Sequence, residues 1–483
     1  ATVENGETAW IYADGGGSGA IVRTAVSSTK LLDQDGDTGI RVEEGGDDDD
    51  TIRFDVAGAE DFTMSAGSLN VLTGSVLALP DAAVATPALT NTGDLNTGLY
   101  FPAADTVGVT TGGTEQFRFG SNTTAAASKN VIINGSMQVC QRPTSTAGVG
   151  NGDTGYVGPD QWYFDEAGTV EGVITVSQET GGGVGGQDRW MKILCTTEEA
   201  LGATTDQMQM MQRLEAQNCV PLKNGATGIA ETTISADIII HADGSSGLSF
   251  PVKVAFSVHT QDGTARQCIG DMSITANDTW ERVSITLPAD STATFVSDNA
   301  LGCTFNISLC GGSGRNATNL TWANEAADFN TSSSDNILDQ ANNYIGVTRV
   351  QWEVGAVPTD FPYENITNIL QKCQRYFYST NLYEQSTRWG LGAYDATNAL
   401  GTRQTFPVQM RAAPTAAFTS SVFLSAHNGS YHDTSITLSF VEDQFGYQPY
   451  ISVQSSGTQG EWYWIGDNSG DASTGAVTFT AEL

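Results

Sequence analysis

Residues Gln351–Phe377 read QWEVGAVPTDFPYENITNILQKCQRYF. The first half of this stretch predicts a strand followed by a turn, and the second half predicts a short amphipathic helix. One stripe of the helix is apolar, because apolar residues recur at helical spacing: Ile366, Ile369, Leu370, Cys373 and Phe377. We therefore interpret Gln351–Phe377 as a latch, a strand and helix that join a β-domain before it to another β-domain after it.

The rest of the chain has the composition of an all-β protein. Its 483 residues suffice for about three domains with real hydrophobic cores. Only 16% of the residues are charged, and short apolar runs alternate with clusters of Gly, Asn, Asp and Ser. Long helical periodicity is absent outside the latch, so we expect strands joined by turns.

The net charge of the chain limits the kinds of partner that it can bind. The 55 acidic residues outnumber the 21 basic ones and give a net charge of −34. This balance argues against nucleic acid, which needs clustered Lys and Arg, and against adhesion to an anionic membrane. The charge serves either solubility or a specific acidic binding face. No apolar run approaches a membrane span, and residues 1–14 lack the features of a signal peptide, so we expect no membrane insertion.

The seven cysteines do not form a disulfide framework, because their number is odd and their spacing is irregular. No pair has the C-x-x-C spacing of a zinc or redox site. We expect buried free thiols in a protein assembled in a reducing cytoplasm. Cys303 and Cys310 remain an alternative, as a pair bridged across a hairpin.

The N-terminal quarter consists of short strands. Residues 1–30 predict a small β unit around the turn Asp14–Gly17. Residues 31–128 contain a near-repeat, whose copies span 37–60 and 96–115. Neither copy has enough apolar side chains for a core of its own, and such units are usually stable only when stacked or when identical chains wrap together. Residues 71–88 between the copies predict a linker or a short buried helix.

The remainder of the chain predicts larger β-domains. Residues 129–365 form the largest, and several of its strands alternate apolar and polar residues as a β-sandwich requires: Thr232–Ile240, Val252–His259 and Glu281–Leu287. Residues 366–380 form the linking helix, and residues 381–483 form a C-terminal β tip domain.

Several motifs in this part resemble landmarks of tailed-bacteriophage tail fibres and receptor-binding proteins. They are Asn134–Arg142, Gly155–Trp162, Thr279–Arg282, Gln351–Gly355, Cys373–Phe377 and Phe406–Thr415. The resemblance covers the latch, the domain before it and the domain after it. It implies a jelly-roll, carbohydrate-binding-like domain within an elongated, all-β, homotrimeric fibre whose shaft is the β-repeat of residues 31–128.

The resemblance also implies a function. Residues 1–30 would attach the fibre to other virion structural proteins, and the distal half would recognise a surface glycan or protein receptor of the host. The protein would be located in the virion after assembly in the host cytoplasm, and it would not be an enzyme. Two alternatives are a fibre or decoration protein of the capsid or collar, and a tailspike that cleaves glycans.

Aromatic residues of the tip domain are the candidate glycan contacts, because indole rings stack on sugars and Tyr adds a polar group. They are Trp389, Tyr394, Trp462, Tyr463 and Trp464. The alternative for all of them is packing in a core or subunit interface. We expect Trp162, Trp280 and Trp352, which lie within the jelly-roll landmarks, to be core residues.

An acidic loop is the candidate metal site. Asp33, Asp35, Asp37 and Glu44 occupy positions 1, 3, 5 and 12 of an EF-hand loop, the pattern of a calcium site. Position 6, where the sharp turn needs Gly, is Thr38, and the sequence after it predicts a strand where an EF-hand has a helix. A solvated turn is therefore the alternative, and no cofactor other than calcium is expected.

Catalytic motifs are absent from the sequence. No G-x-S-x-G elbow, H-E-x-x-H pair or P-loop is present, and His427 and His432 fall in a predicted surface loop. Two carboxylates suffice to cleave a glycan. However, no regular coil repeat of a parallel β-helix is visible, so we expect a binding protein.

Overall fold

The computed structural model shows an all-β protein. It describes residues 9–13, 22–26, 30–35, 37–44, 47–119, 130–184, 188–223, 228–294, 296–380, 388–393, 404–418, 422–426, 431–432, 437–452, 462–467 and 477–483. For several strands, among them 388–393 and 462–467, only the backbone is described. The chain forms two compact units, Ala1–Thr123 and Thr124–Leu483, which are described separately below.

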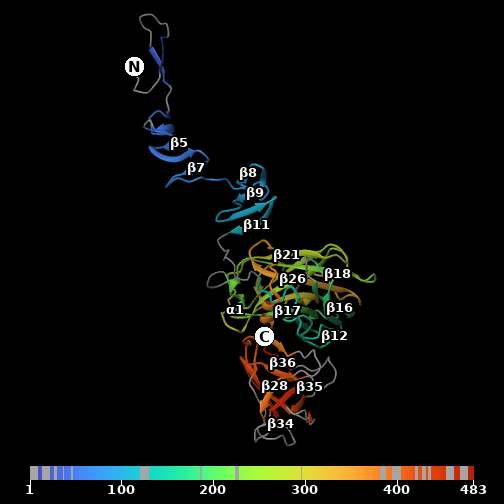
Figure 1. Ribbon diagram of the computed structural model, residues 1–483. Helices are drawn as coiled ribbons and strands as arrows, with labels where there is room; N and C mark the ends of the chain where they lie inside the picture. The colour runs from blue at the N-terminus through green and yellow to red at the C-terminus, as the bar shows by residue number, and fades with distance from the viewer. Residues whose placement is uncertain are drawn as a thin grey trace. The chain divides into compact units, whose positions relative to one another are not determined.

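The described residues of the first unit form three antiparallel sheets (Figure 1). The first pairs β1 (Ala9–Ala13) with β2 (Val22–Val26). The second has five strands in chain order: β3 (Lys30–Leu32), β4 (Gly39–Glu44), β5 (Asp47–Val56), β6 (Ala59–Ser65) and β7 (Ser68–Val71). The third has four: β8 (Leu89–Asn91), β9 (Asp94–Tyr100), β10 (Val107–Thr111) and β11 (Thr114–Phe119).

The near-repeat of the sequence corresponds to two β-hairpins. The turn between β5 and β6 is Ala57-Gly58, with φ of 51° and 79°, and the turn between β10 and β11 is Gly112-Gly113, with φ of 57° and 76°. Positive φ at both central residues gives the tight turn whose twist matches the flanking strands. The helix considered for residues 71–88 is not found there, and β7 ends within that segment, at Val71.

Two antiparallel sheets form the sandwich of the second unit. One has the strand order β12 (Ser145–Gly150), β15 (Val173–Thr180), β16 (Arg189–Thr197), β26 (Tyr344–Val354), β18 (Thr232–His241) and β21 (Glu281–Leu287). The other has the order β13 (Gly155–Tyr156), β14 (Tyr163–Ala167), β17 (Gln207–Glu215), β22 (Leu301–Gly311), β19 (Val252–Thr260), β20 (Arg266–Ile274) and β24 (Ala323–Asn324). The strands predicted from alternation are therefore confirmed as β18, β19 and β21.

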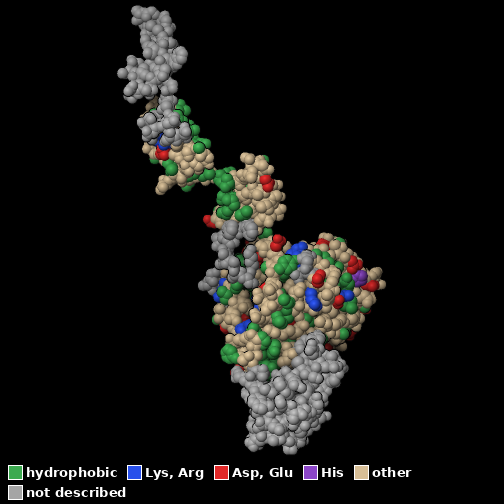
Figure 2. Space-filling view, viewed as in Figure 1, with side chains coloured by type: hydrophobic (Ala, Val, Ile, Leu, Met, Phe, Trp, Pro, Cys, Tyr) green, Lys and Arg blue, Asp and Glu red, His purple; other side chains and the backbone are tan. Residues whose placement is uncertain are grey.

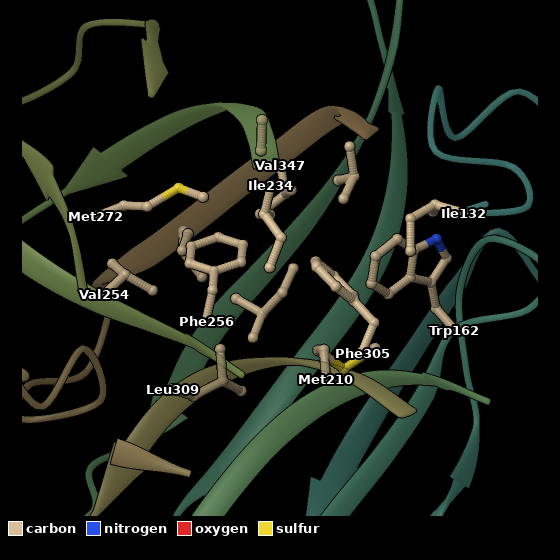
Figure 3. Packing of buried hydrophobic residues seen from close by; sticks show 14 of the residues in the cluster. Ile132, Trp162, Met210, Ile234, Val254, Phe256, Met272, Phe305, Leu309 and Val347 are labelled. Carbon is tan, nitrogen blue, oxygen red and sulfur yellow. The ribbon is translucent and has the colours of Figure 1, made fainter. Parts of the chain in front are cut away.

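The hydrophobic core lies between these two sheets (Figure 3). Phe256 and Phe305 meet at its centre with ring centroids 6.0 Å apart, and Ile234 and Val347 approach from the opposite sheet. Each such side chain contributes about 1.5–3 kcal/mol when fully buried. The cysteines of the chain are all free, and six of the seven are buried. Cys303 and Cys310 lie on the same strand, β22, so the hairpin disulfide considered for them does not form.

The latch helix is α2 (Ile366–Gln374), with the Asn365 side chain accepting from the Thr367 amide as N-cap. Ile369 and Cys373 of the predicted stripe are buried, but Ile366 is half exposed. Phe377 does not continue the helix, since it begins β27 (Phe377–Ser379) and pairs with Thr480. Within the described residues, no helix is long and apolar enough to cross a membrane.

In the part of the second unit that was predicted as the tip domain, the described residues form three small sheets. Their strand orders are β27-β36-β30, β28-β35-β31-β32 and β29-β34-β33. The strands are β28 (Arg388–Ala393), β29 (Gln404–Thr405), β30 (Thr415–Phe418), β31 (Val422–Ala426), β32 (Tyr431–His432), β33 (Thr437–Asp443), β34 (Gly446–Ser452), β35 (Trp462–Asp467) and β36 (Val477–Thr480).

Ion pairs and hydrogen bonds join the tip domain and the latch to the sandwich. Arg375, at the C-cap of α2, binds both carboxylate oxygens of the fully buried Glu215 at 2.7 and 2.8 Å. Asn218 donates to the Tyr376 hydroxyl at 3.1 Å. The Arg411 amide of the tip domain donates to the backbone oxygen of Arg375 at 2.8 Å, and Arg411 Nη1 donates to the backbone oxygen of Asn299 in the sandwich at 3.2 Å. The end of the latch therefore fixes the tip domain against the sandwich.

Candidate functional site

A cluster of aromatic side chains lies on the outward face of the six-stranded sheet. We call it the aromatic cluster, and its members are half-buried: Trp190, His241, Trp280 and Tyr344. Trp280 was expected in the core, but β21 begins one residue later, at Glu281, and Trp280 lies on the outside. By contrast, Trp162 and Trp352 are fully buried, as predicted.

Strand alternation places Trp190 outside the core. Its neighbours Met191 and Ile193 are buried between the sheets, so Trp190 and Lys192 point the other way. Gly346, on the adjacent strand β26, leaves room for the indole. A Cβ at Gly346 would lie 2.8 Å from Trp190 Cε3 and Cζ3. The ring therefore rests directly on the backbone of the sheet.

The rings contact one another at angles that favour attraction between them. Trp190 and Trp280 meet edge to face, with centroids 5.5 Å apart and planes at 87°. The rings of His241 and Tyr344 are stacked, with centroids 5.1 Å apart. Pairs of this kind contribute about 0.5–1.5 kcal/mol beyond the area that they bury. These contacts hold the four rings in fixed positions, although the cluster lies outside the core.

Hydrogen bonds from both indoles hold the rings in place. Trp190 Nε1 donates to the oxygen of Gly181 at 2.8 Å, and Trp280 Nε1 donates to that of Gly182 at 2.8 Å. The two acceptors are consecutive residues of the turn after β15. Since both N–H groups are satisfied internally, the exposed parts of the indoles present carbon atoms, which suit a flat apolar ligand face.

Charged groups surround the aromatic cluster. Lys192 Nζ lies 4.4 Å from the centroid of the Tyr344 ring. Asp278, half exposed, contacts His241 Nδ1 at 2.7 Å. Burial, and to a smaller extent the charge of Asp278, raises the pKa of Tyr344, so its hydroxyl stays protonated at neutral pH. The site thus combines apolar rings with an ammonium, a carboxylate and a hydroxyl.

The structure describes the predicted tip residues only in part. Trp462, Tyr463 and Trp464 lie on β35, which pairs with β28 on one side and β31 on the other. Trp389 lies at a register shift of β28. The side chains of these four residues, and the whole of Tyr394, lie outside the described residues. Their role in glycan binding stays a prediction.

The acidic loop brings its aspartates together. Carboxylate oxygens of Asp33, Asp35 and Asp37 all lie within 4.8 Å of one another, and the three side chains are exposed. The Thr38 amide donates to Asp33 at 3.2 Å, and β4 begins at Gly39, so a strand follows the loop. The side chain of Glu44 lies outside the described residues. Asp33, Asp35 and Asp37 therefore lie close enough together to contact one ion. The calcium site stays a prediction.

Sequence reasoning missed Trp190 and Tyr344. The alternation of Arg189–Thr197 would have placed Trp190 on the outside, since Met191, Ile193 and Cys195 all face the core. That Trp190 meets Tyr344 follows only from the order of the strands, in which β16 and β26 are neighbours although far apart in sequence.

The fold and this site define an all-β protein whose sandwich carries an outward aromatic cluster. No protein-family model matches the chain, and no curated protein matches it. Among solved structures, an arabinose-bound MgGH51 α-L-arabinofuranosidase is similar at 12% identity and a TM-score of 0.22, over 43% of this chain and 26% of that chain. The CBM22-1–CBM22-2 tandem domain of Paenibacillus barcinonensis Xyn10C is similar at 10% identity and a TM-score of 0.19, over 65% of this chain and 92% of that chain. At TM-scores this low, neither likeness bears on fold or function, and this chain spans about a quarter (26%) of the arabinofuranosidase.

Proposed function

We propose that this chain is a homotrimeric fibre protein of a virus particle, with a jelly-roll domain that binds a glycan of the host surface. The observation that carries the binding part is the aromatic cluster on the outward face of the sandwich. The virion location rests on the sequence motifs. Attachment to other virion proteins would fall to residues 1–30.

The chemistry of the cluster suits a sugar ring. A pyranose has an apolar face of C–H groups, which can lie on the carbon atoms of Trp190 and Trp280. Lys192 and Asp278 at the rim can donate to and accept from the sugar hydroxyls. A shallow surface of this kind binds weakly. Several copies on one particle would raise the overall avidity by about 10²–10⁴.

The binding test uses the full-length protein and isolated host polysaccharide, followed by calorimetry. We expect Trp190→Ala and Trp280→Ala each to weaken binding at least tenfold, which is about 1.4 kcal/mol. The control is Phe445→Ala, which removes an exposed aromatic side chain of the tip domain and should leave binding unchanged. If Trp464→Ala abolishes binding and Trp190→Ala does not, the site belongs to the tip domain.

The location and the absence of catalysis are tested separately. Gold-labelled antibody against the protein should mark the tail of the particle, and label on the shell or collar would favour the decoration protein instead. Host polysaccharide incubated with the protein should release no reducing ends. Their release would identify a tailspike enzyme.

A further inference from the structure

One face of the five-stranded sheet of the first unit carries a set of aligned apolar side chains. Cross-strand partners lie on the same face of a sheet, and the register aligns apolar residues in two rows. One row is Leu31, Ile40, Phe54, Phe62 and Val71, and the other is Val42, Ile52, Met64 and Leu69. We call these nine side chains the apolar face.

The apolar face is open to solvent in the single chain. None of its members is buried, and Leu31 is 71% exposed, Leu69 55% and Met64 44%. Hydrophobic side chains, green in Figure 2, reach the surface in this part of the chain. A sheet with one apolar face normally buries it against another layer. Exposure on this scale therefore indicates a missing partner.

The opposite face of the same sheet carries a network of ion pairs. Arg41 binds Asp55 and, at 3.2 Å, Glu60, and Arg53 reaches Glu60 at 3.1 Å. Thr63 and Asn70 continue this polar row across β6 and β7. The polar side chains of this face bind one another. The apolar side chains of the other face are exposed in the single chain.

The next sheet repeats the arrangement. Leu89, Leu99 and Val109 are cross-strand partners on β8, β9 and β10. Leu89 is 52% exposed. A partner that covers both sheets must itself offer apolar surface to successive parts of the chain.

We propose that the occupant of the apolar face is the same face of other copies of this chain, packed together in the homotrimer of the proposed function. Around a threefold axis each copy can turn the same face toward the axis, so that three copies cover one another's apolar side chains. Five strands about 4.8 Å apart present a face of roughly 400 Å². In a trimer each copy contributes such a face, and its apolar character is that of obligate oligomers.

The electrostatics of the chain favour the same occupant. A net charge of −34 on each copy opposes association through charged surfaces. Packing the apolar faces around a common axis places Arg41, Asp55 and Glu60 on the outside, where water screens them.

The test compares substitutions on the two faces of adjacent strands in the full-length protein. Light scattering of the native protein should give three times the mass of one chain. Met64→Glu with Leu69→Glu places two carboxylates on the apolar face, at paired positions of β6 and β7, and we expect a dissociation constant at least tenfold higher and monomers at low micromolar concentration. The matched control is Ser65→Glu with Asn70→Glu, one residue further along each strand and on the opposite face, which should leave the mass unchanged.

Failure of this inference is distinguishable from failure of the proposed glycan binding. The glycan affinity of a single site in the monomeric variant should equal that of the native protein, because the aromatic cluster belongs to the second unit. A native monomer, or a double variant that stays trimeric with unchanged stability, would overturn the interface whether or not glycan binds. A trimer lost as expected, without any glycan binding in either form, would support the interface and reject the function.

Discussion

Arg142 and Glu482 lie 340 residues apart in the sequence and form an ion pair of 2.5 Å between the sandwich and the end of the tip domain. The Glu482 side chain is 3% exposed and that of Arg142 12%. Asp160, fully buried, approaches the same guanidinium at 3.5 Å. Arg142 also lies 3.7 Å from the centroid of the Phe377 ring. One arginine thus contacts the sandwich, the latch and the tip domain together.

Stability of this junction should depend on pH. Burial, only partly offset by Arg142, raises the pKa of Glu482 from 4.5 to about 7, and burial also raises the pKa of Asp160. A carboxyl whose folded pKa is raised binds its proton more tightly in the folded state. The contribution of Glu482 to the free energy of unfolding is therefore complete below about pH 4.5. It is lost as the pH rises through about 7, and the loss is roughly 3 kcal/mol at most.

The measurement is the midpoint of thermal unfolding between pH 5 and pH 8.5. Native protein should lose stability over this range, but the net charge of −34 contributes to the same trend. Glu482→Gln isolates the local effect, because its amide mimics the protonated acid beside Arg142, Asp160 and Arg213. The stability of the variant relative to the native protein should rise with pH, and a constant difference would contradict the prediction.

Removal of Arg375 should destabilise the second unit strongly. Its partner Glu215 is fully buried, so Arg375→Ala leaves a buried carboxylate without its cation, at a cost of about 3–5 kcal/mol. Lys372→Ala on the same helix is the control, since its pair with Glu364 is exposed and is expected to contribute at most about 1 kcal/mol. Urea denaturation measures both. Adding Glu215→Gln to Arg375→Ala should recover part of the lost stability. Equal stability costs for Arg375→Ala and Lys372→Ala would refute this account.

A methyl group under Trp190 should disturb the aromatic cluster without removing any aromatic residue. Gly346→Ala places its Cβ 2.6 Å from Ile239 Cγ2 and 2.8 Å from the indole. We expect a stability cost of about 1–3 kcal/mol and a lower glycan affinity. Gly244→Ala has no atom within 4 Å of its Cβ, and it should change neither. Unchanged binding by a folded Gly346→Ala variant would show that the position of Trp190 does not matter.

The calcium prediction at Asp33, Asp35 and Asp37 requires a stabilising effect of the ion. Calcium at millimolar concentration should raise the unfolding midpoint of the first unit, because a divalent cation relieves repulsion among three carboxylates within 4.8 Å. Asp35→Asn should reduce this shift while leaving the second unit unaffected. An unchanged midpoint after chelation of the native protein would remove the site.

The sequence predicted local structure better than it predicted contacts between distant strands. Alternation and turn chemistry located β18, β19 and β21, because they act over a few residues. The motif at Asn134-Gly135 is structural: Asn134 binds the backbone of Val139 and Asp160, and a Cβ at Gly135 would lie 2.2 Å from the Val350 oxygen. A motif of this kind therefore indicates how the chain folds and carries no information about a ligand.

The aromatic cluster could not be predicted in the same way. Trp190, Tyr344 and His241 meet because β26 lies between β16 and β18, and that order depends on pairings between residues more than 100 positions apart. Trp280 was misassigned because a residue that directly precedes a strand can point to either face. The apolar face was locally readable, since Ile40, Val42, Ile52 and Phe54 alternate with polar residues, but only the register shows that the rows align.

The open apolar face has a consequence for how the protein is produced. A newly made chain exposes the apolar face until other copies cover it, so correct assembly competes with aggregation. Assembly of identical chains accelerates steeply with concentration, whereas the charge of −34 slows every random encounter by mutual repulsion. Expression level and ionic strength should therefore decide how much of the protein reaches its assembled form, and a chaperone that shields the first unit should raise that yield.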